Sequence, residues 1–143
     1  MRRPVVPAVL LLAFSALTAG ACGSSPTTPT TPSTTVATVT EVFTGRLSVN
    51  GAVNFPFTVS TAGVISLTLQ ALDPDPDATA AIGLSLGTWN GTVCTVQLPN
   101  DRALAGSVIL GSAAGAGPLC ARVSDATGNL TAPISFSIAV VHL

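Results

Sequence analysis

One histidine, His142, is the chain's main candidate for acid–base chemistry, and it stands one residue before the C-terminus. A serine hydrolase needs a histidine held between a nucleophile and an orienting acid, and residues at a chain end are expected to fray. The sequence contains no lysine and no tyrosine. Each of its three cysteines has an anchoring or structural role in the interpretation that follows. We therefore expect no catalytic residues and no enzyme activity, with His142 capping the last strand.

Three aspartates at alternate positions, Asp73, Asp75 and Asp77, form the sequence DPDPD and are the candidate for a metal site. A calcium loop of the EF-hand type also needs a glycine at its sixth position and an acid at its twelfth. Those positions hold Ala78 and Leu84, and the prolines stiffen the backbone. We therefore expect a solvated turn between two strands and no metal or cofactor, with a calcium site as the alternative.

The single tryptophan, Trp89, is the candidate ligand-binding residue. It stands beside the turn sequence Asn90-Gly91, where an exposed ring could stack on a sugar. The alternative is an aromatic ring packed in the core or at its rim, as a large apolar side chain usually is. The chain has one tryptophan and five phenylalanines, too few for a platform of several rings, so packing is the expectation.

The first 21 residues have the layout of a secretory signal peptide. Arg2 and Arg3 form a positive segment, residues 5–17 are mostly apolar, and small residues occupy positions 19–21. The apolar run is shorter than the roughly 20 residues that a membrane-spanning helix needs. An uncleaved N-terminal membrane anchor is the alternative.

Residues 17–22, LTAGAC, resemble the lipobox of bacterial lipoproteins, in which small residues precede a cysteine. The resemblance implies that Cys22 receives diacylglycerol and that the signal is cut before it. Thr18 and Ala19 depart from the commonest lipobox pattern, which has leucine three positions before the cysteine. Two or more acyl chains anchor a protein stably where one does not. We therefore expect an exported protein whose lipid holds it to the membrane, the outer membrane being favoured over the inner one.

Cys94 and Cys120 are the expected disulfide. The chain has three cysteines, and lipidation of Cys22 leaves an even pair. Export places this pair in an oxidising compartment, and closing the loop would stabilise the fold by about 3 kcal/mol in the chain-entropy model. Two buried free thiols are the alternative. Cys120 is in phase with Arg122 and Ser124, away from the apolar face, which a bulge or a disulfide on the outer side would explain.

Residues 24–35, SSPTTPTTPSTT, consist of serine, threonine and proline alone. Such a segment cannot build a core, and proline at every third position matches the three-residue turn of polyproline II. We assign residues 22–37 to the lipidated cysteine and a disordered linker that lifts the following domain from the headgroups. A glycosylated stalk is the alternative.

Residues 38–143 alternate apolar and polar side chains in about eight segments, as in residues 53–59 and 134–140. Turn sequences separate the segments every ten residues or so. This pattern predicts an all-β domain, a single β-sandwich. Pro56 removes a ladder donor, so its strand is expected at a sheet edge or bulged there. Asn50-Gly51 is expected to form a type I′ hairpin turn.

Three stretches of this region resemble the bacterial pre-peptidase C-terminal domain, a jelly-roll-like β-sandwich. They are residues 55–63 (FPFTVSTAG), 82–87 (IGLSLG) and 117–123 (GPLCARV). The resemblance implies an accessory, non-catalytic module of secreted proteins. Gly83 and Ser85 stand in the strand where family members usually carry aspartate, and the late strand lacks their tyrosine. The calcium binding and substrate adhesion of some members therefore do not carry over.

The net charge of the chain further limits the kinds of binding partner. After removal of the signal, three arginines face six acids, a net charge of −3. Such a chain cannot neutralise many phosphates, so no nucleic-acid partner is expected. The sequence thus predicts a lipid-anchored, non-catalytic binding or structural module with an unidentified protein or polysaccharide partner. A carbohydrate-binding module, or an accessory domain or subunit of a secreted hydrolase, is the alternative.

Overall fold

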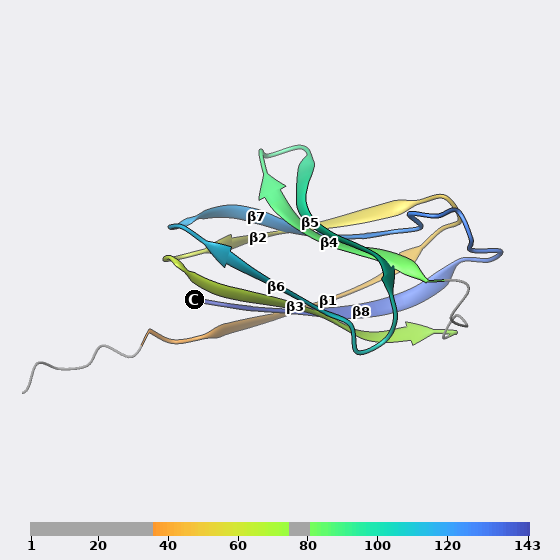
Figure 1. Cartoon of the computed structure of the whole chain (residues 1–143), viewed down its shortest axis with the longest axis horizontal. Coiled ribbons are helices and arrows are strands. Elements are labelled where there is room, and N and C mark those ends of the chain that lie inside the picture. Colours follow the sequence, from red (N-terminus) through yellow and green to blue (C-terminus); the bar gives the residue numbers. More distant parts are fainter. Residues whose placement is uncertain (1–35, 75–80) are drawn as a thin grey trace, which may run out of the picture. The chain divides into compact units, whose positions relative to one another are not determined.

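A computed structural model describes residues 36–74 and 81–143 of the chain (Figure 1). All regular structure in these ranges is β-strand, so the predicted all-β class is confirmed. The eight strands are β1 (Val39–Leu47), β2 (Ala52–Val59), β3 (Gly63–Asp73), β4 (Ile82–Trp89), β5 (Cys94–Ala103), β6 (Val108–Ala113), β7 (Gly117–Ser124) and β8 (Ile134–His142).

The strands form two antiparallel sheets that face each other as a β-sandwich (Figure 1). Sheet 1 has the order β1-β8-β3-β6, and sheet 2 has the order β2-β7-β4-β5. Every connection crosses from one sheet to the other except the β4–β5 hairpin. This order is that of a jelly roll, in which eight strands divide between two sheets. It places β7 beside β4, although β5 and β6 lie between the two strands in the sequence, and so brings β7 next to the β4–β5 hairpin.

The core lies between the sheets and follows from the period-2 pattern of each strand. In β3, Ile65, Leu67 and Leu69 are buried, whereas the residues between them are at least partly exposed. Rings from β1, β2 and β8 pack together against this core. The Phe43 and Phe55 ring centroids are 5.0 Å apart, and Phe136 meets Phe55 edge-on at 5.8 Å, separations that favour aromatic pairs.

The predicted hairpin at Asn50-Gly51 is wrong, because β1 and β2 belong to different sheets. The Gly51 N–H donates to the Ser48 carbonyl at 2.9 Å, so the turn is centred one residue earlier. Asn50 has a φ of 54°, whereas a type I′ turn needs a positive φ at both central residues. The same residue types occur in the turn of a hairpin and in a connection between two sheets. The local sequence therefore could not show which of the two connections forms here.

The expectation for Pro56 is confirmed. Strand β2 lies at the edge of sheet 2, and its register with β7 runs without a break from Ala52 to Val59. An edge strand has one side without a ladder partner, so a missing N–H costs nothing there.

The expected signal peptide (residues 1–21), the lipidation site Cys22 and most of the linker lie outside the described residues, as do Asp75 and Asp77. In the ranges that the structure does describe, no helix is long and apolar enough to cross a membrane.

Candidate functional site

His142 does not fray, contrary to expectation. It is 3% exposed. It pairs with Val39, because β1 pairs with β8 along the whole length of β8. Its Nε2 lies 3.0 Å from Oε1 of Glu41, its Nδ1 lies 3.2 Å from the Leu143 carbonyl oxygen, and its ring centroid is 5.4 Å from that of Phe57. Both ring nitrogens are thus engaged by the sandwich itself, and His142 acts as a buried part of the core.

The disulfide between Cys94 and Cys120 is confirmed, with Cα atoms 5.8 Å apart. It joins β5 to β7, which flank β4 and do not pair with each other. Cys120 lies opposite Gly87 of β4, and a Cβ at Gly87 would collide with the backbone of Thr95. The β7 register continues unbroken past Cys120, so the disulfide, rather than a bulge, explains why this residue is out of phase with the apolar face.

Of the three aspartates that could bind a metal ion, the described residues include Asp73, which is the exposed last residue of β3. Among residues 36–74 and 81–143, no three histidine, cysteine, aspartate or glutamate side chains gather closely enough to hold a metal ion. The described residues therefore do not provide a set of ligands for the calcium site that was the alternative.

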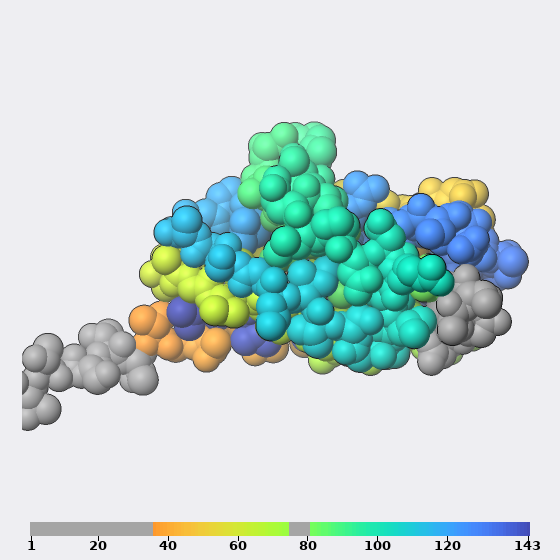
Figure 2. All heavy atoms as spheres, viewed as in Figure 1, coloured from red at the N-terminus to blue at the C-terminus, as the bar shows by residue number. Residues whose placement is uncertain are grey.

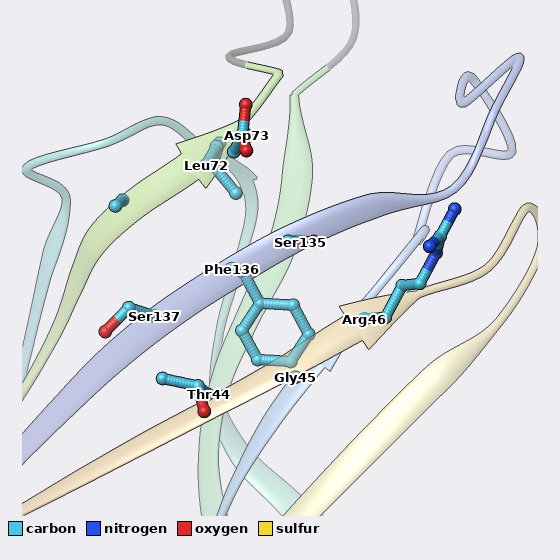
Figure 3. A pocket seen from close by; sticks show the side chains of 9 residues that line it. Thr44, Gly45, Arg46, Leu72, Asp73, Ser135, Phe136 and Ser137 are labelled. Carbon is cyan, nitrogen blue, oxygen red and sulfur yellow. The ribbon is translucent and has the colours of Figure 1, made fainter.

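Each sheet has a depression on its outer face. The depression on sheet 1 has a volume of about 470 Å³ and lies where β1, β8 and β3 run together (Figure 3). Arg46 and Asp73 come from the strands on either side of β8, and both pair in register with Ser135. Phe136 and Leu72, buried core residues, also line it. This depression is therefore polar at its rim and apolar at its base.

The depression on sheet 2 has a volume of about 450 Å³ and a more polar lining. We call it the polar groove and define it by Ser85 of β4, Asp101 of β5, and Arg122 and Ser124 of β7. Ser85 pairs directly with Arg122 across the β4–β7 ladder. The groove thus gathers side chains from three strands at the middle and the β5 edge of one sheet.

The charged side chains of the polar groove are available to a ligand. The ion pair that the described residues contain is His142–Glu41, and neither Arg122 nor Asp101 takes part in one. Ser85 is 4% exposed and Ser124 is 9% exposed, so their hydroxyls lie low in the groove. The groove therefore offers guanidinium donors, carboxylate acceptors and hydroxyls that can do both.

Asp125 also borders the groove, but its carboxylate is used to hold the neighbouring turns. Its Oδ2 accepts the Asn50 N–H at 2.9 Å and its Oδ1 accepts the Asn129 N–H at 3.0 Å. Its own N–H donates to the Gly51 carbonyl at 2.9 Å. The wall at this end of the groove is thus fixed by one buried side chain.

Replacing Asp125 by alanine is expected to lower the free energy of unfolding by about 2–4 kcal/mol, because two backbone donors lose a charged acceptor. Urea unfolding of the variant measures the loss. Asp125→Asn, which keeps one acceptor oxygen, should lose less, and Asp101→Ala at the exposed rim should change the midpoint little. An Asp125→Ala protein with the wild-type midpoint would contradict this role.

Trp89 lies away from both depressions. It is the last residue of β4, is half-buried, and pairs with Cys94. The hairpin that it begins extends beyond the rest of the sandwich (Figures 1 and 2). Trp89 does not belong to the buried core cluster and lies instead at the rim beside the disulfide.

The groove residues Ser85, Asp101 and Arg122 were not candidates on sequence grounds. The phase that Arg122 shares with Cys120 did place it on an outer face. Nothing local, however, indicates that β4 and β5 bring Ser85 and Asp101 beside it, since this follows from the order of strands in the sheet. Neither protein-family models nor the sequences of curated proteins give a match to this chain.

Proposed function

We propose that this chain is a lipid-anchored, exported binding module whose polar groove takes a hydroxyl-rich ligand, a glycan of the cell envelope, without turning it over. One observation carries the proposal. Arg122 and Asp101 share a groove with two buried serines and make no ion pair within the described part of the chain. A small number of convergent polar groups in a preformed concavity can fix the orientation of a ligand and give specificity.

The chemistry of the groove favours a polyol over an ionic ligand. Sugar hydroxyls can donate to a carboxylate and accept from a guanidinium, and the groove provides both charges together. A strongly anionic ligand would meet Asp101 as well as Arg122, and the chain has no lysine to offset that carboxylate. None of the described residues that line the groove is aromatic. Binding therefore rests on hydrogen bonds, and the dissociation constant is expected to be about millimolar.

The groove is also better fixed in place than the depression on sheet 1. The disulfide ties β5 to β7, and Asp125 holds the turn that borders the groove. A site whose walls are locked by neighbouring bonds loses less entropy when a ligand binds.

The positions of the acids support binding without turnover. Glycosidases generally use two carboxyl groups about 5–10 Å apart. Of the two aspartates that line the groove, Asp101 is free, whereas both oxygens of Asp125 already accept backbone N–H groups. His142 is engaged in the core. Anchoring rests on the lipobox resemblance at Cys22 and on the linker, which leads directly into β1.

Arg122→Ala is the variant that tests the groove. We expect it to weaken glycan binding by about tenfold or more, since a hydrogen bond to a charged group contributes about 1.5–3 kcal/mol. Isothermal titration of the full chain with a panel of neutral and acidic envelope polysaccharides measures the affinity.

Arg46→Ala is the matched control, because Arg46 occupies the corresponding depression on sheet 1 and should leave the affinity unchanged. If Arg46→Ala abolishes binding while Arg122→Ala does not, the ligand lies on sheet 1 and the proposed site is wrong.

A further inference from the structure

The sandwich has four edge strands, β1 and β6 in sheet 1, and β2 and β5 in sheet 2. An edge strand is open to pairing with another chain unless proline, charge or a bulge prevents it. Strand β2 carries Pro56. Strand β5 carries Pro99 and two charged residues, and its register with β4 shifts twice. Strand β1 carries Glu41 on its inward face and Arg46 on its outward face.

Strand β6 has none of these protections. Its sequence is VILGSA, without proline or charge, and its register with β3 is unbroken. The chain carries no charged residue from Ala103 to Ala121. Val108 is 50% exposed and Leu110 is 69% exposed. In Figure 2 the cyan atoms of this segment lie uncovered on the face toward the viewer.

The hydrogen-bond pattern shows which backbone groups of β6 face outward. The Leu69 N–H donates to the Ser107 carbonyl at 2.9 Å, so the carbonyl of Ser107 points toward β3. Successive residues of a strand direct their N–H and C=O groups to opposite sides. Val108, Leu110 and Ser112 therefore present theirs to the open edge, and β6 pairs with β3 alone among the described strands.

We propose that β6 pairs antiparallel with β6 of a second copy of this chain, so that sheet 1 continues from one molecule into the other. A two-fold axis would place the same uncharged segment on both sides, and no charge on either strand would oppose the approach. The contact would also cover Val108 and Leu110 from both copies. The Thr/Pro segment of the same chain (residues 24–35) is less suited to pair with the open edge of β6, because its three prolines lack the N–H that pairing requires.

The proposed dimer is independent of the proposed ligand site, since the polar groove lies on the outer face of sheet 2. A strand of six residues provides a small interface, so we expect a reversible dimer with a micromolar dissociation constant. Loss of glycan binding would leave this association unchanged, and loss of the dimer would leave the groove intact.

Sedimentation equilibrium of the full chain, in a detergent matched to the density of the solvent, tests the dimer. Leu110→Pro removes a donor at the open edge without removing a bond to β3, and Leu110→Lys sets like charges against each other across the axis. Each should raise the dissociation constant by at least about tenfold. The matched control is Val42→Lys on β1, which changes an exposed valine of the same sheet at its other edge and should change the constant less than about twofold.

A wild-type chain that stays monomeric at every concentration would overturn the proposal. So would equal weakening by Leu110→Lys and Val42→Lys, because association would then depend on the outer face of sheet 1 and not on its β6 edge. If Leu110→Pro fails to fold, the comparison between the two lysine variants still decides the question.

Discussion

A Cys22→Ala chain is expected to lose acyl label completely and to move from the detergent phase to the aqueous phase. The expectation follows from the lipobox resemblance of residues 17–22. Each buried CH₂ of an acyl chain contributes about 0.8 kcal/mol, so the loss of two or more chains removes stable anchoring. Growth with a labelled fatty acid, followed by detergent phase partition, measures both effects.

A double Cys94→Ser/Cys120→Ser chain is the control, because it lacks two cysteines and keeps Cys22. It should retain both the label and the detergent partition. If Cys22→Ala partitions like the wild type, the apolar segment of residues 5–17 anchors the protein and lipidation at Cys22 is wrong.

Removal of the Cys94–Cys120 disulfide is expected to lower the free energy of unfolding by about 3 kcal/mol. The cysteines are separated by 26 residues, and opening a loop of that size returns this much chain entropy to the unfolded state. For a domain of this size the urea midpoint should fall by about 1–3 M. Urea titration of the oxidised and reduced protein measures the shift.

The position of the disulfide adds a local consequence. Strand β5 lies at a sheet edge with most of its side chains exposed, so its first residues depend on β4 and on the bond to β7. Amide exchange in residues 94–97 should therefore speed up more than exchange in β8 on reduction. A reduced protein with an unchanged midpoint, or cysteines that alkylate under native non-reducing conditions, would contradict the assignment.

The strands could be predicted because their cause is local. Side chains alternate between the faces of a sheet, so Ile65, Leu67 and Leu69 indicated both the presence of β3 and its buried face. The position of Pro56 at an edge followed from its missing N–H. The disulfide followed from the cysteine count and the expected compartment.

The features that were mispredicted or missed depend on which strands become neighbours. The turn at Asn50-Gly51 gave no sign that it joins two sheets. His142 was expected to fray from its position in the chain, whereas pairing with β1 buries it. Ser85 and Asp101 meet Arg122 only because β4, β5 and β7 are adjacent in sheet 2. The alternation of apolar and polar residues along a strand indicates which face of the sheet a side chain occupies. The pairing of strands that are distant in sequence decides which other side chains lie on that face beside it.

Residue-resolved chemical shifts of the isotope-labelled full chain, titrated with envelope glycans, test the proposed function most directly. The account predicts saturable shifts at the residues of the polar groove, Ser85, Asp101, Arg122 and Ser124, while the spectrum of the glycan shows no product. Shifts centred on Arg46 and Asp73, an absence of saturable shifts across the panel, or conversion of the glycan during the titration would contradict it.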